Sequence, residues 1–230
     1  MIFFHIFVPT TSHNAMKYLS FFILLFIGEL SVSAQHMFSR QFPFFNQLSS
    51  NEIFSIHQDR EGYFWIGTTN GLARYDGYQL NTFRTDYKNQ NLLTDNGITA
   101  INDNDLYVWI GTWKGLNLYN KQTCRITPFS DARLLDKVVD AITVDKDGNV
   151  WVSAGGMIYR CDSTAHIIKE YEVGNIQEGY AISNIYVDQQ KQLWAVGSRG
   201  IFRYEPETDS FFRYPPLGNG HTAYIMHQDS

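Results

Sequence analysis

One pattern occurs four times in the sequence, and a tryptophan marks each copy. The tryptophans are separated by 44, 42 and 43 residues, and the sequence around each aligns without gaps. An aspartate precedes each by six residues, and a glycine follows each by six, except in the third copy, which has Met157 there. The aligned pairs are Asp59 and Trp65, Asp103 and Trp109, Asp145 and Trp151, and Asp188 and Trp194.

Each copy also contains four short segments with the composition of β-strands. In the first copy they cover residues 53–58, 63–68, 72–75 and 79–84, and no segment after residue 35 shows a sustained helical period. A period of about 43 residues with four strands per repeat is typical of a β-propeller blade. We therefore predict an all-β fold with blades of four antiparallel strands at residues 51–95, 96–136, 137–180 and 181–220.

The repeated residues have clear roles in such a blade. A single blade cannot bury both of its faces, so each blade needs a neighbour, and tryptophan is large and flat enough to fill the space between two blades. Gly67 and Gly111 allow another chain to approach closely. An alternating apolar run opens each repeat, which we align as IFSI (53–56), ITAI (98–101), DAIT (140–143) and ISNI (182–185).

The two ends of the sequence carry further signals. Residues 221–230 resemble the start of the first repeat and predict the first strand of a fifth blade, so we expect an incomplete propeller that belongs to a longer, seven-bladed one. Residues 1–34 have the pattern of a secretory signal peptide, with Met16 as the true start, followed by a lead-in segment at 35–50. An uncleaved anchor is the alternative, and in both cases the repeats lie in the periplasm.

Net charge and cysteine content give two further expectations. The net charge of −5 argues against nucleic-acid binding through this segment, which needs a basic face. The two cysteines, Cys124 and Cys161, lie in different repeats, so we expect two free, buried thiols and leave a disulfide as the alternative.

The pattern I-x-x-I-x-x-D-x-x-G-x-x-W-I-G-T-x-x-G-L-x-R-Y-D resembles the two-component regulator propeller repeat, and the first copy matches it from residue 53 to 76. Later copies depart locally, with Asn104 and Asp105 in the second turn and Ser153 in place of the repeat glycine in the third. The resemblance implies the periplasmic sensor region of a hybrid two-component histidine kinase. It further implies an oligosaccharide ligand, further blades and kinase domains in the same protein, and a possible homodimer.

A family of this kind implies no cofactor and no enzymatic activity in this segment. Two alternatives stay open: a periplasmic propeller lyase or hydrolase acting on a glycan, and a non-catalytic propeller that binds another protein. No catalytic arrangement can be recognised by spacing. His57 lies in a predicted strand and is assigned a structural role, and Asp145 to Gly148 is assigned a turn rather than a calcium loop.

The best candidates for ligand binding are the loops between the second and third strands. Trp113 is the only tryptophan outside the repeat position, and an exposed tryptophan can carry a sugar ring. Its predicted partners are Lys114, Asn70 and Arg199, which can donate hydrogen bonds. The alternative is that Trp113 packs on the loop of the next blade.

Overall fold

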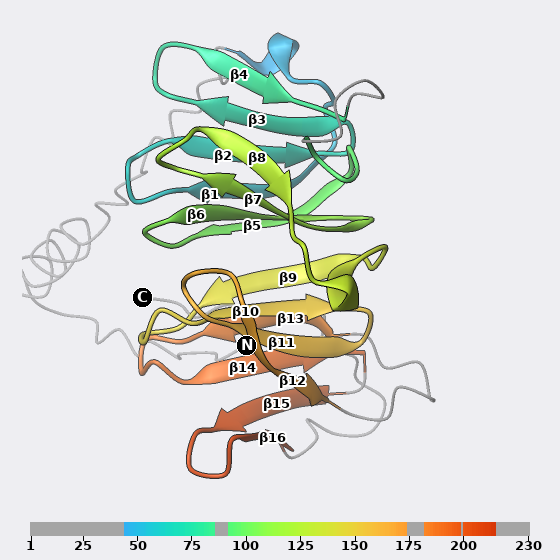
Figure 1. Ribbon diagram of the computed structural model, residues 1–230, viewed down its shortest axis with the longest axis vertical. Coiled ribbons are helices and arrows are strands. Elements are labelled where there is room, and N and C mark those ends of the chain that lie inside the picture. The colour runs from blue at the N-terminus through green and yellow to red at the C-terminus, as the bar shows by residue number, and fades with distance from the viewer. Residues whose placement is uncertain (1–43, 86–91, 174–181, 199, 215–230) are drawn as a thin grey trace, which may run out of the picture. The chain divides into compact units, whose positions relative to one another are not determined.

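The structure is a computed structural model that describes residues 44–85, 92–173, 182–198 and 200–214. These residues all belong to one structural unit, residues 42–230. They form four separate four-stranded antiparallel sheets, which confirms the predicted all-β propeller fold (Figure 1). The predicted signal peptide, most of the lead-in segment and the predicted start of a fifth blade lie outside the described residues.

Each sheet is one blade, and its strands follow one another in chain order. Blade 1 contains β1 (Ile53–Gln58), β2 (Phe64–Thr68), β3 (Gly71–Tyr75) and β4 (Leu80–Phe83). Blade 2 contains β5 (Ile98–Asp103), β6 (Tyr107–Thr112), β7 (Gly115–Asn120) and β8 (Arg125–Pro128). Blade 3 contains β9 (Val139–Val144), β10 (Val150–Ala154), β11 (Met157–Cys161) and β12 (Ile167–Glu172). Blade 4 contains β13 (Ile182–Val187), β14 (Leu193–Gly197), β15 (Gly200–Glu205) and β16 (Ser210–Arg213).

The first strands of consecutive blades lie side by side, β1 beside β5, β5 beside β9 and β9 beside β13, so the sheets stack in chain order (Figure 1). Among the described residues there are two 3-10 helices: η1 (Phe45–Gln47) precedes blade 1, and η2 (Ala132–Leu134) connects blades 2 and 3. The described part of the chain contains no helix long and hydrophobic enough to span a membrane.

Three of the four repeat tryptophans fill the space between blades, as their size predicts, whereas Trp194 of blade 4 is partly exposed. Trp65, Trp109 and Trp151 are at most 1% exposed, and each belongs to a core cluster shared with the following blade. The repeat glycines explain how blades come so close. A Cβ on Gly67 would lie 2.6 Å from Ile98 Cγ2 of blade 2, and a larger side chain there would force the blades apart.

The first strand of blade 3 starts one residue earlier than the sequence alignment assumed. Val139 pairs with Ala154, as Ile53 pairs with Thr68 in blade 1. The equivalent of IFSI is therefore VDAI at 139–142, and the DAIT alignment is wrong. A register shift follows the first pair of this strand in both blades, and such bulges cannot be placed from an apolar pattern alone.

Both cysteines are free thiols, but only one is buried. Cys161 lies in the core cluster of blades 2 and 3, and burial raises the pKa of its thiol to about 12. The expectation that Cys124 is buried is wrong. Cys124 lies in the turn after β7 with a φ of 55° and is exposed.

Candidate functional site

Two aromatic rings from different blades form an exposed surface at the end of blade 2. Trp113 follows β6 and is 44% exposed, and Phe54 of β1 is 56% exposed. The ring centroids lie 6.2 Å apart with an interplanar angle of 66°. Edge-to-face pairs of this kind are favourable beyond the area that they bury. The contact therefore helps to fix the orientation of both rings while leaving much of each accessible.

Backbone contacts hold Trp113 in place. Its backbone N–H donates to the carbonyl of Gly97 at 3.1 Å, and the backbone N–H of Gly97 donates to Asp95 Oδ1 at 2.8 Å. A Cβ on Gly97 would lie 2.4 Å from the Trp113 ring, so the indole rests directly on this glycine. Trp113 thus packs on the segment that precedes β5 of its own blade and on Phe54 of blade 1.

The predicted partners of Trp113 differ in how free they are to bind. Lys114 Nζ lies 3.8 Å from Asp95 Oδ2, and its side chain is 65% exposed, so this pair is weak and the ammonium remains available. Asn70 is exposed, but its amide Nδ2 already donates to the carbonyl of Ser49 at 3.3 Å. No hydrogen bond or ring contact joins Asn70 to Trp113 among the described residues. Arg199 lies outside the described residues.

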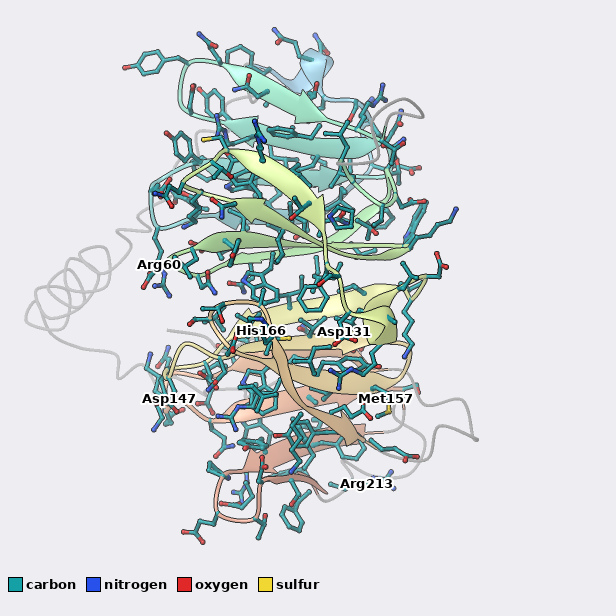
Figure 2. All side chains as sticks on the ribbon, in the orientation of Figure 1. Arg60, Asp131, Asp147, Met157, His166 and Arg213 are labelled. Atoms are coloured by element: carbon teal, nitrogen blue, oxygen red, sulfur yellow. The ribbon has the colours of Figure 1, made fainter. Side chains whose placement is uncertain are left out.

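The loop between β10 and β11 of blade 3 carries no large side chain, but a lysine from the preceding segment lies against it. A Cβ on Gly155 would lie 3.0 Å from Lys137 Cδ, and Lys137 Nζ donates to Tyr159 Oη at 2.8 Å. Figure 2 shows Met157, which follows this loop, on the opposite side of the blades from Arg60 and Asp147, which lie in the turns after β1 and β9. No repeat position marks Lys137 in the sequence, because it lies in the segment that connects η2 to β9.

Asp140 is a second residue that the sequence analysis missed. It follows Val139 in β9, as Phe54 follows Ile53 in β1, so both residues occupy the bulge of an innermost strand. Burial raises the pKa of the Asp140 carboxyl from 3.8 to about 6. A carboxyl group titrating near neutral pH is a common mark of a functional site. The sequence marks Asp140 only as an aspartate at a position where the other repeats have Phe54, Thr99 and Ser183.

His57 takes part in an ion cluster between blades 1 and 2. Its Nε2 lies 2.7 Å from Asp103 Oδ1, and Lys121 Nζ donates to Asp103 Oδ2 at 2.7 Å. Burial by itself raises the pKa of Asp103, but the hydrogen bonds from His57 and Lys121 outweigh burial and hold this pKa at about 2. The cluster joins two blades, in keeping with the structural role that the sequence assigned to His57.

The carboxylate of Asp145 is occupied within its own hairpin. It accepts hydrogen bonds from the backbone N–H groups of Asp147 and Asn149, both at 2.9 Å, and from Trp151 Nε1 at 2.8 Å. These contacts make it the cap of a turn. No group of three metal-binding side chains occurs among the described residues.

A family model described as two component regulator propeller matches residues 47–70. This range contains β1, β2 and the turn that Asp59 closes. The match confirms the resemblance to the two-component regulator propeller repeat. No curated protein matches the chain.

Several solved structures share the fold. The extracellular domain of a putative one component system from B. thetaiotaomicron is 22% identical and covers 70% of this chain, with a TM-score of 0.57. The extracellular domain of a putative hybrid two component system from the same organism is 21% identical and covers 76%, with a TM-score of 0.52. Virginiamycin B lyase from Staphylococcus aureus is 18% identical and covers 73%, with a TM-score of 0.59.

The chain spans only part of these proteins: 22% and 31% of the two extracellular domains and 57% of the lyase. At such identities the likeness shows the propeller fold alone. Because extracellular domains and an enzyme both have this fold, function has to be argued from the residues of the site.

Proposed function

We propose that this chain, which carries the two-component regulator propeller repeat, is an extracytoplasmic sensor module that binds an oligosaccharide at the loop of Trp113. Binding would be relayed to a histidine kinase elsewhere in the same protein, which acts as a homodimer. The family match to residues 47–70 and the likeness in fold to extracellular domains of such systems support this proposal.

The observation that carries the proposal is an exposed aromatic ring that is already fixed. Sugar rings present C–H faces that pack on aromatic side chains, and a site whose ring needs no reordering loses less entropy on binding. Trp113 satisfies both conditions, since it is 44% exposed and rests on Gly97 and Phe54.

The neighbouring polar groups suit sugar hydroxyls. The exposed Lys114 ammonium follows Trp113 in the sequence and pairs only weakly with Asp95, so it can donate to a ligand. Asn70 would have to exchange its hydrogen bond to Ser49 for one to the ligand, so its contribution is expected to be smaller. Arg199 stays a predicted contact.

The test is a calorimetric titration of the full chain with a panel of defined plant and host oligosaccharides, which measures the affinity for each. We expect at least one to bind, and Trp113→Ala to weaken that binding by about tenfold or more. The matched control is Tyr78→Ala, because Tyr78 is 87% exposed in the turn between β3 and β4 and should leave affinity unchanged. Equal affinity of both variants for the bound oligosaccharide would exclude Trp113 from the site.

The relay is tested separately on the full-length protein in membranes. The oligosaccharide that binds the sensor should change the rate of kinase autophosphorylation, and Trp113→Ala should remove that change. A change that persists in this variant would mean that the signal enters through another site.

One observation favours a second candidate, a glycan lyase or hydrolase. Asp140 has a pKa of about 6 and can both accept and donate a proton near neutral pH. Product formation from the bound oligosaccharide, abolished in Asp140→Asn, would establish the enzyme. Unchanged oligosaccharide after long incubation supports the sensor.

A further inference from the structure

The face of blade 2 that is directed at blade 3 contains a pocket of about 480 Å³. Its lining residues come from three adjacent strands and the turn after β7. They form two cross-strand rows: the first joins Tyr107, Asn120 and Arg125, and the second joins Leu118 and Thr127, with Thr123 at the turn. The volume falls within the range of small-molecule sites.

The pocket exists because blade 2 lacks an arginine that the other blades have. The residue paired with the repeat tryptophan is Arg74 in blade 1, Arg160 in blade 3 and Arg203 in blade 4, but Leu118 in blade 2. In blade 1 this arginine fills the gap to the next blade. The guanidinium carbon of Arg74 lies 5.9 Å from the Trp65 ring centroid, and its Nη1 donates to Tyr119 Oη at 2.5 Å.

Leu118 is too short to occupy the same space. It is 8% exposed and packs on the tryptophan, but it cannot extend along the sheet as an arginine side chain does. The pocket therefore lies where the filling arginine of the other blades is missing.

The tryptophan of this row is also unusual. Trp109 Nε1 is buried and has no hydrogen-bond partner, whereas the indole nitrogens of Trp65, Trp151 and Trp194 each donate to the aspartate of their own repeat at 2.7–2.8 Å. Buried donors are nearly always paired, so an unpaired one calls for an explanation. Blade 2 thus lacks both the repeat arginine and the hydrogen bond to the repeat tryptophan. Both changes lie in the cross-strand row that contains the pocket residues Leu118 and Thr127.

The lining groups have a consistent chemistry. Arg125 is exposed, and no hydrogen bond or ion pair to it is recorded within the described residues. The side-chain oxygen of Asn120 accepts from the backbone N–H groups of Gln122 and Thr123, which leaves its amide N–H₂ free to donate. Thr123 and Thr127 add two hydroxyls, Tyr107 adds an aromatic ring, and no carboxylate lines the pocket.

We propose that this pocket binds a small polyhydroxylated carboxylate, of the size and chemistry of a single hexuronic acid. The carboxylate pairs with the guanidinium of Arg125, which is suited to bidentate recognition. The ring hydroxyls bind Asn120 and the two threonines, and the sugar ring packs against Tyr107. This site is separate from the Trp113 loop and does not depend on the function proposed for it.

The test uses ligand-observed NMR titrations of the full chain with D-glucuronate and D-glucose, which share the sugar ring and differ in the carboxylate. Because the chain carries a net charge of −5, it has no general attraction for anions, so a preference for glucuronate reports a local site. We expect glucuronate to bind at least about tenfold more tightly than glucose.

Three variants assign the binding to this pocket. Arg125→Gln should remove the preference for glucuronate. Leu118→Arg restores the arginine of the other blades, refills the pocket and should abolish binding of both sugars, with a thermal melt to confirm folding. Tyr78→Ala, in the exposed turn between β3 and β4, should change neither.

Either of two results would overturn the proposal. No glucuronate binding by the unchanged chain, or a preference that survives Arg125→Gln, would each be decisive. Since Arg125 is exposed, its variant keeps the fold and decides the question alone if Leu118→Arg does not fold.

Discussion

The first hairpins of blades 1 and 2 both have an aspartate six residues before the repeat tryptophan, but the two aspartates lie at different places in the hairpin: Asp59 follows β1, whereas Asp103 is the last residue of β5. In blade 1, Asp59 stays within its hairpin. Its carboxylate accepts hydrogen bonds from the backbone N–H groups of Glu61 and Tyr63 at 3.0 and 2.9 Å, and from Trp65 Nε1 at 2.7 Å. One buried carboxylate thus closes the turn and satisfies the tryptophan that the blades pack around.

In blade 2, Asp103 leaves its hairpin and connects two blades. It accepts hydrogen bonds from His57 Nε2 and Lys121 Nζ, both at 2.7 Å, and from the backbone N–H of Arg60 at 3.3 Å. The indole of Trp109 is left without its acceptor.

The cause is the length of the turn: the backbone hydrogen bond that closes it joins Asp59 to Tyr63 in blade 1, but Asn104 to Tyr107 in blade 2, which is one residue fewer. By strand pairing, Asp103 lies opposite Val108 as Gln58 lies opposite Phe64, so Asn104 is the counterpart of Asp59 and the gap-free alignment of Asp103 with Asp59 is wrong. The side-chain oxygen of Asn104 accepts from the backbone N–H groups of Leu106 and Tyr107 at 3.0 and 2.8 Å. Asparagine caps such turns as well as aspartate does. Asn104 therefore caps the turn in the place of Asp59, and Asp103, at the end of β5, binds across the blade interface. A turn that is one residue shorter thus gives a different role to an aspartate at the same spacing from the tryptophan.

The largest expected effect is that of removing Asp103. In Asp103→Ala, the Lys121 ammonium, whose side chain is 6% exposed, loses its partner inside the interface. Removing one partner of a buried ion pair costs about 3–5 kcal/mol of the free energy of unfolding. Urea denaturation measures this loss.

The control for this prediction is Asp105→Ala. Asp105 also pairs with an arginine, Arg60, but its side chain is 81% exposed, so the expected loss is below about 1 kcal/mol. Similar losses in the two variants would mean that the cluster between the blades contributes no more than a surface pair.

The corresponding change in blade 1 should cost less. Asp59→Ala leaves Trp65 Nε1 as a buried donor without an acceptor and opens the turn, for an expected loss of about 2–3 kcal/mol. Asp59→Asn keeps an acceptor oxygen and should recover part of this loss. A loss larger than that of Asp103→Ala would reverse the comparison between the two hairpins.

Asp103 should also make the stability of the fold depend on pH. The pKa of Asp103 is about 2 in the folded protein, below the ordinary value of 3.8. A carboxyl group whose pKa is lowered on folding stabilises the fold above the ordinary pKa, and this stabilisation is lost as pH falls from about 4 to about 2. The difference amounts to about 2 kcal/mol. Asp103→Asn should therefore flatten the dependence of the unfolding free energy on pH in this range, as measured by denaturation at several pH values.

The repeat explains why so much of the fold could be predicted. The first-blade strands predicted at 53–58 and 72–75 agree with β1 and β3 to within one residue, because turn residues and apolar alternation mark their ends. The start of β9 was misplaced because a bulge changes the register without changing the composition. The exposure of Cys124 was missed because it depends on a turn conformation with positive φ.

The candidate sites were less predictable, because they depend on contacts between blades. Trp113 could be singled out as a tryptophan outside the repeat position, but its contact with Phe54 requires two strands that are 40 or more residues apart in sequence to lie side by side. Leu118 was visible as a departure from the repeat arginine. Its consequence, a pocket, appears only when the neighbouring blade is in place.

The smallest expected effect is a difference between two equivalent tryptophans. Trp65→Phe and Trp109→Phe remove similar volume from two blade interfaces, so both destabilise the fold. Only Trp65→Phe also removes a hydrogen bond and leaves Asp59 Oδ2 without its indole donor, whereas Trp109→Phe removes a donor that has no partner. We expect Trp65→Phe to cost about 1 kcal/mol more, since that is the net value of a typical hydrogen bond.

A double-mutant cycle makes this comparison independent of the lost volume. The Asp59 and Trp65 substitutions should show a coupling of about 1 kcal/mol, and those of Asp103 and Trp109 a coupling near zero. A coupling in blade 2 as large as in blade 1 would mean that Asp103 contacts Trp109 in solution. Blade 2 would then be an ordinary copy of the repeat, and the unpaired indole could no longer be counted among the features that set its pocket apart.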